Sequence, residues 1–245
     1  MTSVGLGADL ERALSQRGAA VADRIAKTAR TLCPNPVRAL DLGGGDGSVT
    51  GILTTQLGVR FILLDRTPTG GDGGTFSPVR GTATSLPFRD GTFDLVTLIS
   101  VYEHLGDRTR RESMLREILR VLRPGGVLVG QMPNMNFPVE IHSKLPLVQF
   151  LPRSMALPYY RLLAPVSRER KRQYGIRWYR VTATDLWREA HGVGFQEGRI
   201  WAVNLPRQAL PAVFQPFYVV TRAIPLNWDF YFVRPVRAPV ARDKP

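Results

Sequence analysis

Residues 39–50 read ALDLGGGDGSVT, and this stretch decides the fold. Its apolar opening, Ala39 to Leu42, is typical of the end of a buried strand, and a helical pattern begins at Ser48. The glycines between them are therefore expected to form a tight turn from a strand into a helix. In α/β folds such turns bind ligands, and the residues around the glycines indicate which kind.

The spacing and charge of this turn argue against a phosphate ligand. A dinucleotide-binding fingerprint counted from Gly43 needs a glycine at position 48, where this chain has Ser48. A pyrophosphate at this helix N-terminus would also meet the carboxylate of Asp46. A ligand with an ammonium and a sulfonium group would instead be attracted by Asp41 and Asp46, while the glycines let the backbone approach its carboxylate and ribose.

Length and composition predict one elaborated α/β domain. The chain has 245 residues, of which 44% are hydrophobic, which is enough for a full core but short for two independent domains. We predict an N-terminal helical segment, 1–36, and a domain at 37–245 with insertions at about 134–180 and 204–227. Cys33 is the only cysteine, so no paired-cysteine metal site can form, and we predict no metal.

The charge is concentrated in the second half of the chain. The formal net charge is +13, and residues 134–245 contribute +10 of it, with 17 Lys/Arg against 7 Asp/Glu. No apolar run reaches the roughly 18 residues of a membrane span, and the N-terminus does not resemble a secretory leader. We therefore expect a cytoplasmic protein, and the insertions considered below leave peripheral contact at the inner face of the membrane open.

Apolar runs and helical patterns alternate along the first half of the chain. Strands are predicted at 37–42, 59–64, 93–99, 127–132, 195–203 and 228–233, and helices at 8–32, 47–57, 107–122 and 183–191. The Arg-Pro-Gly-Gly sequence at 123–126 predicts a helix end. Such alternation favours a mostly parallel sheet with helices on both faces. The proline-rich stretch 133–180 and the second insertion are interpreted as a substrate lid.

The residues Asp41 to Gly47, DLGGGDG, resemble the first motif of class I S-adenosylmethionine-dependent methyltransferases. Further motifs follow in the family's order: FILLD ending at Asp65, GTATSLPFRDGTFDL at 81–95, and SVYEHLGDR with LREILRVLRPGGVLV at 100–129. The last two resemble the methyltransferase type 11 branch, which includes quinone-biosynthesis enzymes. The resemblance covers roughly residues 38–133. It implies a Rossmann-like fold with a mostly parallel seven-stranded sheet, helices on both faces and a C-terminal lid insertion.

The same resemblance implies S-adenosylmethionine as the cofactor and indicates where it binds. The implied cofactor residues are Asp41, Gly43, Gly44, Gly45, Asp65, Arg66, Thr82, Ala83 and Ser100. Asp65 matches the acidic residue that holds the ribose, and a carboxylate can accept two hydroxyl protons at once. Thr82 stands where the family usually has an acidic residue for the adenine amino group, which is a departure from the pattern. Asp94, by contrast, is predicted to orient the end of a strand.

Two places in the sequence offer a catalytic base. His104 follows the fourth predicted strand, and Glu103–His104 matches a Glu-His pair of the quinone enzymes, although a histidine there can also simply bond the loop backbone. Glu140 and His142 lie on one side of an extended chain after the next strand and could form a base with its orienting carboxylate, or a surface hydrogen bond. Tyr102 could contact a sulfonium through its ring, but core packing is the commoner role.

The insertions indicate the class of acceptor. Residues 141–168 and 198–228 contain no Asp or Glu but many apolar residues and scattered arginines. Such stretches could rest on anionic lipid and admit a lipid-linked acceptor, or they could be an ordinary lid. We predict methyl transfer to a small-molecule or lipid-linked acceptor, at oxygen.

Two alternatives stay open at this point. The first is an RNA methyltransferase that uses the basic and aromatic cluster at 168–180, so nucleic acid is the alternative partner. The chain lacks the Asn/Asp-Pro-Pro-Tyr/Phe motif of amino-methylating nucleic-acid enzymes and lacks a suitably placed Pro-Cys nucleophile. The second alternative is a non-catalytic cofactor-binding subunit, which the departure at Thr82 suggests.

Overall fold

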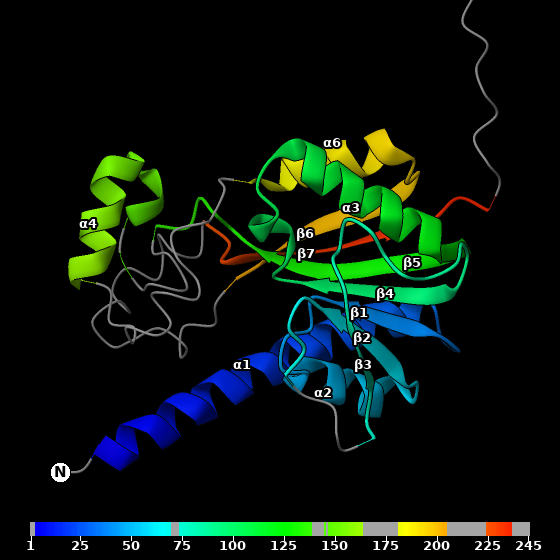
Figure 1. Cartoon of the computed structure of the whole chain (residues 1–245), viewed down its shortest axis with the longest axis horizontal. Helices are drawn as coiled ribbons and strands as arrows, with labels where there is room; N and C mark the ends of the chain where they lie inside the picture. The colour runs from blue at the N-terminus through cyan, green and yellow to red at the C-terminus, as the bar shows by residue number, and fades with distance from the viewer. Residues whose placement is uncertain are drawn as a thin grey trace, which may run out of the picture.

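The chain forms a seven-stranded sheet in the order β3-β2-β1-β4-β5-β7-β6 (Figure 1). This computed structural model describes residues 3–69, 74–138, 145, 147–163, 181–204 and 224–236. The strands are β1 (Ala39–Leu42), β2 (Phe61–Asp65), β3 (Ser77–Arg80), β4 (Phe93–Ile99), β5 (Leu122–Pro133), β6 (Glu197–Val203) and β7 (Asn227–Val233). The first five pair in parallel, and β7 is antiparallel to both β5 and β6. The predicted mostly parallel seven-stranded sheet is confirmed.

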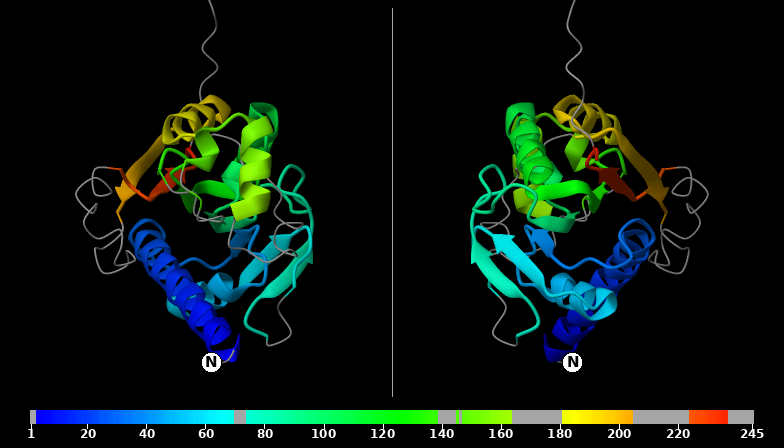
Figure 2. Two further views of the ribbon diagram at one scale, coloured as in Figure 1. Left: turned by 90° about the vertical axis from the view of Figure 1, so that its left-hand side faces the viewer. Right: turned by 90° about the vertical axis from the view of Figure 1, so that its right-hand side faces the viewer.

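Helices cover both faces of this sheet, as the sequence predicts. α1 (Ser3–Leu32) and α2 (Ser48–Leu57) pack on one face, and α3 (Arg108–Val121) and α6 (Ala183–Val193) on the other (Figures 1 and 2). Successive residues of a strand pack into the two hydrophobic cores on opposite faces of the sheet: Leu95 packs with α1 and α2, whereas Val96 packs with α3 and α6. Strands buried on both faces explain why their sequences are continuous apolar runs rather than alternating ones.

Two polar devices fix the ends of these elements. Asp94 accepts hydrogen bonds from the backbone amides of Val37 and Arg38, both at 2.8 Å, so it holds the segment before β1 against β4. This confirms its predicted role at a strand end. At the start of α6, Thr182 and Asp185 form a reciprocal capping box, in which each side chain accepts a hydrogen bond from the other residue's backbone amide.

The elements differ from the prediction in three respects. β3 was not predicted, because Pro78 interrupts it and, as a short edge strand, it carries little apolar signal. The Arg-Pro-Gly-Gly sequence does follow the end of α3, but it forms the irregular start of β5. The stretch expected to be irregular contains a 3-10 turn, η2 (Val148–Phe150), and a helix, α4 (Arg153–Leu163), which keeps Pro158 inside it.

Several predicted features fall outside the described residues. These are Glu140, His142, the cluster at 168–180 and most of the second insertion, 204–227. The division into a segment at 1–36 and a domain at 37–245 stays a prediction, while the second half of α1 packs directly on the sheet. Within the described part of the chain, no helix combines the length and the apolar character that crossing a bilayer requires.

Candidate functional site

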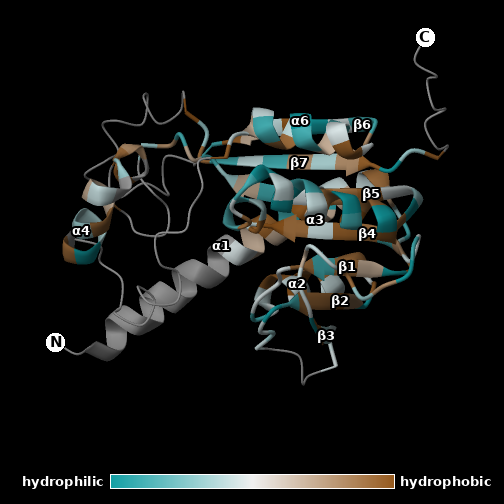
Figure 3. Ribbon diagram, turned by 45° about the horizontal axis from the view of Figure 1, so that its top comes forward, coloured by the Kyte–Doolittle hydropathy of each residue, from teal (hydrophilic) through white to brown (hydrophobic). Residues whose placement is uncertain are grey.

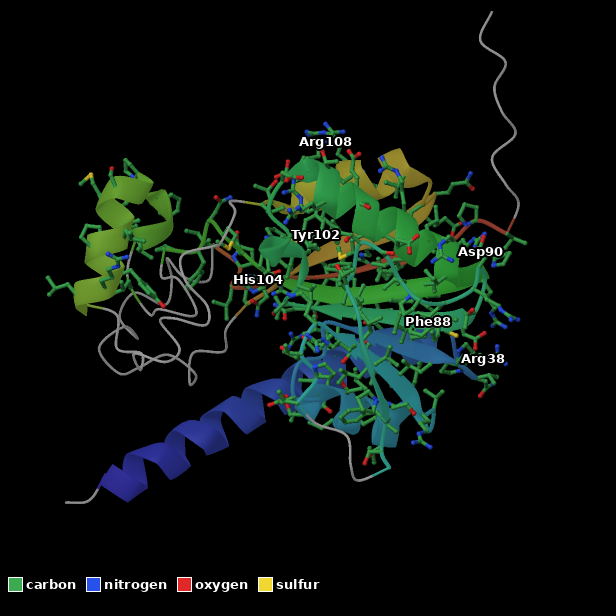
Figure 4. The ribbon with its side chains drawn as sticks, viewed as in Figure 1. Arg38, Phe88, Asp90, Tyr102, His104 and Arg108 are labelled. Carbon is green, nitrogen blue, oxygen red and sulfur yellow. The ribbon has the colours of Figure 1, made fainter. Side chains whose placement is uncertain are left out.

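The predicted cofactor residues gather at one edge of the sheet. The glycine turn follows β1, Asp65 ends β2, Thr82 follows β3 and Ser100 follows β4, and these strands are parallel neighbours. Their carboxyl ends therefore meet at one edge, which is where open α/β sheets bind ligands. Figure 4 shows His104 at this end of the sheet and Arg38 at the opposite end.

The glycines of the turn have different physical roles. At Gly43, Gly44 and Gly47 an added side-chain carbon would lie less than 3 Å from other side chains of the protein, so these glycines permit internal packing. Gly45 has a left-handed φ of +58°, and nothing lies within 4 Å of the position its side chain would take. Of the four, Gly45 alone has this free space beside it, and it is only partly buried, which suits close approach of a ligand to the backbone.

Asp65 lies beside this open position. Its carboxylate accepts hydrogen bonds from the backbone amides of Gly45, at 3.2 Å, and Thr67, at 2.9 Å. The amide of Gly81 donates to the backbone carbonyl of Asp65, at 2.9 Å, and so brings the loop with Thr82 and Ala83 alongside. Each carboxylate oxygen retains a lone pair, so the geometry suits the predicted bond to ribose hydroxyls. Arg66 and Thr82 are exposed at the same edge.

Asp41 is placed differently from the expectation that it contacts the cofactor. It is buried, and its two oxygens accept hydrogen bonds from the hydroxyls of Thr50, at 2.5 Å, and Thr97, at 2.6 Å. Burial raises the pKa of this carboxyl, and the two hydroxyl donors act in the opposite direction. In this structure Asp41 therefore supports the glycine turn from within the core. Asp46 is exposed and accepts a hydrogen bond from the amide of Ser48 at the start of α2.

Replacing Asp65 with alanine is expected to weaken cofactor binding by about 1–3 kcal/mol, because charge-assisted hydrogen bonds to the ribose would be lost. Isothermal titration calorimetry with S-adenosylmethionine measures this directly. Asp46→Ala is the matched control, since it removes a carboxylate of the same charge from the neighbouring turn. Equal losses in both variants would indicate a general charge effect and contradict a specific ribose contact.

The chain leaves β4 through a constrained turn. Ser100 has a left-handed φ of +54°, which is uncommon outside glycine, and its amide donates to the carbonyl of Gln131 on β5 at 2.9 Å. The hydroxyl of Ser100 also donates to the side-chain oxygen of Gln131, at 3.2 Å. The next element is the 3-10 turn η1 (Tyr102–His104). The start of η1 is thus fixed to the end of β5.

A buried polar cluster anchors the same turn to the helices. The hydroxyl of Tyr102 donates to the carboxylate of Glu189 on α6, and Arg111 on α3 donates to both oxygens of that carboxylate, at 2.6 and 3.0 Å. The Arg111 guanidinium also lies 5.5 Å from the centre of the Tyr102 ring. Tyr102 therefore belongs to the core, which is the commoner role expected for it, and its hydroxyl reaches Glu189 on α6.

Glu103 is the residue whose importance the sequence did not reveal. It is 1% exposed, and neither of its carboxyl oxygens has a hydrogen-bond partner among the described residues. Burial raises the pKa of this carboxyl to about 8. The Nε2 atom of His104 lies 3.8 Å from Glu103 Oε1, and the His104 side chain is 42% exposed. Glu103 was noted in the sequence only as the neighbour of His104, because its burial depends on tertiary packing.

The titration of Glu103 should make stability depend on pH. With a folded pKa of about 8 and an ordinary value of 4.5, the folded state binds the extra proton between these values, so stability falls as pH rises through this window. The total loss corresponds to roughly 5 kcal/mol as an upper estimate. Urea unfolding at pH 5 and pH 9 should show that Glu103→Gln gains stability relative to the wild type at pH 9. If the difference in unfolding free energy between Glu103→Gln and the wild type is the same at pH 5 and pH 9, the raised pKa of Glu103 is contradicted.

Comparisons with known proteins point to one family. The methyltransferase domain family matches residues 40–130. A protein of Encephalitozoon cuniculi that is named as a methyltransferase is 38% identical over 93 residues, which cover 37% of this chain and 42% of that protein. The ubiquinone/menaquinone biosynthesis C-methyltransferase of Azotobacter vinelandii is 33% identical over 105 residues, covering 38% and 40% respectively. The chain thus spans less than half the length of these curated relatives.

A solved structure supports the fold over a larger part of the chain. The S-adenosylmethionine-dependent methyltransferase from Mesorhizobium loti superposes with a TM-score of 0.59 and covers 85% of this chain and 96% of its own length. The sequence identity is 14%, so this likeness concerns the fold alone. The matched family segment, 40–130, contains the glycine turn, Asp65, Thr82, Ser100 and His104.

Proposed function

We propose that this chain, a member of the class I S-adenosylmethionine-dependent methyltransferases, transfers the cofactor's methyl group to a hydroxyl oxygen of a small-molecule or lipid-linked acceptor. When bound, the cofactor supplies an electrophilic methyl group on a positively charged sulfur. The residues at the sheet edge fit this cofactor: Gly45 leaves room for it beside the backbone, and Asp65 offers acceptor oxygens next to that space.

The observation that carries the choice of oxygen is the Glu103–His104 pair. A hydroxyl acceptor must lose a proton during transfer, whereas a neutral amine can attack before it loses one. His104 is exposed after β4, and its neutral imidazole has a ring nitrogen that can accept this proton. The buried carboxylate of Glu103 stabilises the resulting imidazolium, and it does so once it is ionised itself.

The nature of the acceptor is supported by the composition of the segments that follow β5. Residues 141–168 contain no acidic residue and many apolar ones, which suits a hydrophobic or lipid-linked molecule better than a cationic metabolite. The Azotobacter vinelandii relative is named for methylation at carbon, so the atom that receives the methyl group has to be determined directly.

The proposal is tested by supplying S-adenosylmethionine with a labelled methyl group together with separate lipid, RNA and polar-metabolite extracts. We expect label in the lipid or small-molecule fraction, with mass spectrometry placing the methyl group on oxygen. The Asp65→Ala variant, assayed at a subsaturating cofactor concentration, should lower the transfer and serves as the control for contaminating activities. Label in RNA alone would instead support the RNA methyltransferase, and intact cofactor binding without any transfer would support the non-catalytic subunit.

A further inference from the structure

Large apolar side chains face solvent on one short part of the chain. Seven such side chains are exposed among the residues that the structure describes, and four of them lie within 147–162. These four are Leu147, Phe150, Met155 and Leu162. Single exposed apolar residues are normal on protein surfaces, whereas several gathered on one segment mark a contact surface.

The inner face of α4 is already packed. Ala156 and Tyr160 are buried in a small cluster with Val148 of η2, so this part of the chain has its own core. Met155 and Leu162 lie seven residues apart on the other side of the helix and are 58% and 81% exposed. The exposed apolar stripe is therefore not the side on which α4 packs against η2.

The position of α4 leaves this stripe open to a large partner. Figures 1 and 3 show α4 apart from the sheet, beyond the end at which His104 lies in Figure 4. The main contacts of α4 with other described elements are those with η2. A flat partner could thus approach the stripe at the same end of the molecule as the candidate site.

The charge of the segment indicates what kind of partner fits. Arg161 is exposed on the same helix, and α4 contains two arginines and no acidic residue. In the sequence, 141–168 has four Lys/Arg and no Asp/Glu. Apolar side chains flanked by cationic ones match the boundary between acyl chains and anionic headgroups, where both groups find favourable surroundings. A protein partner with an apolar groove would account for the exposed apolar stripe. It would not account for the complete lack of acidic residues in this segment, which an anionic bilayer does.

We propose that the α4 surface, made of Met155, Arg161 and Leu162, docks on an anionic phospholipid bilayer. This inference goes beyond the proposed methyl transfer, because docking requires neither cofactor nor acceptor. It places the candidate site beside the bilayer, which is where a lipid-linked acceptor would be presented.

The test is flotation of the full chain with vesicles of phosphatidylglycerol and phosphatidylcholine, and with vesicles of phosphatidylcholine alone, without any methyl donor. The wild type should float with the anionic vesicles only, and less as salt is raised. The double variant Met155→Ser/Leu162→Ser should lower the vesicle-bound partition coefficient about tenfold or more. Val37→Ser/Val236→Ser is the matched control, since these side chains are 78% and 77% exposed and lie at the other edge of the sheet. Val37 precedes β1, and Val236 follows β7, which runs antiparallel to β5.

Each outcome decides the proposal. It is overturned if the wild type does not float with anionic vesicles or floats equally with neutral ones. It is also overturned if the α4 double variant floats like the control variant. Thermal unfolding of both double variants checks that they remain folded, which is expected because all four side chains are exposed. A failure of methyl transfer is recorded in a separate assay and leaves the flotation result unaffected.

Discussion

Replacing His104 with alanine is expected to slow methyl transfer by about 10²–10⁴-fold, the usual contribution of a positioned base. The reason is that the proton of a hydroxyl acceptor would lose its receiving group, while the proposed cofactor residues Gly45 and Asp65 stay intact. Turnover is measured by label transfer to the fraction that accepts it, and cofactor affinity by calorimetry on the same preparation. His191→Ala is the matched control, because that histidine lies on α6 and stacks on Trp187.

Glu103→Gln distinguishes a positioning role from a merely structural one. Wild-type kcat/KM should rise with pH and level off above the Glu103 pKa of about 8, because the ionised carboxylate favours the imidazolium. The amide variant should be slower and should lack this rise.

If His104→Ala retains wild-type turnover, the proton leaves by another route. His142→Ala then becomes the decisive variant, since the Glu140–His142 alternative stays a prediction.

Glu189→Ala should cost about 3–5 kcal/mol of unfolding free energy, because it leaves the buried guanidinium of Arg111 without its carboxylate. It also removes the acceptor of the Tyr102 hydroxyl, so two donors lose their partner at once. Urea unfolding followed by circular dichroism measures the loss. We further expect the variant to lower turnover in native buffer, because Tyr102 fixes the turn that carries Glu103 and His104.

A control for this prediction is available on the surface of α3. Glu112 also bonds two arginines, Arg108 and Arg116, but both of these arginines are largely exposed. Water and salt screen such pairs, so Glu112→Ala should cost far less than Glu189→Ala. Similar losses in the two variants would show that burial of the Arg111–Glu189 pair does not determine its contribution.

The fold was largely predictable because its signals are local. β4 is a continuous apolar run, and α6 has a capping box in its sequence, so each is specified by neighbouring residues. β3 and α4 were missed because each contains a proline, Pro78 or Pro158, that normally argues against the element. At β3, pairing with β2 along the open edge outweighs this preference, and at α4 the packing on η2 does.

The candidate site was predictable only in part. The motif order located Gly45 and Asp65 at one edge, and the structure places them in contact. The burial of Asp41 was not predictable, since its partners Thr50 and Thr97 come from separate elements. The burial of the Glu103 carboxyl depends in the same way on what surrounds it, which no spacing in the sequence encodes.

The self-contained start of α6 has a consequence for how such enzymes can be re-engineered. Thr182 and Asp185 start the helix by their own reciprocal bonds, and Leu186 and Ala190 then pack it on the main core. The start of α6 therefore does not depend on the sequence between β5 and this cap, so that segment is a candidate for exchange. On the proposed role of this segment in contacting the acceptor, exchanging it for that of another methyltransferase is expected to change acceptor preference and to leave the fold of residues 37–133 intact.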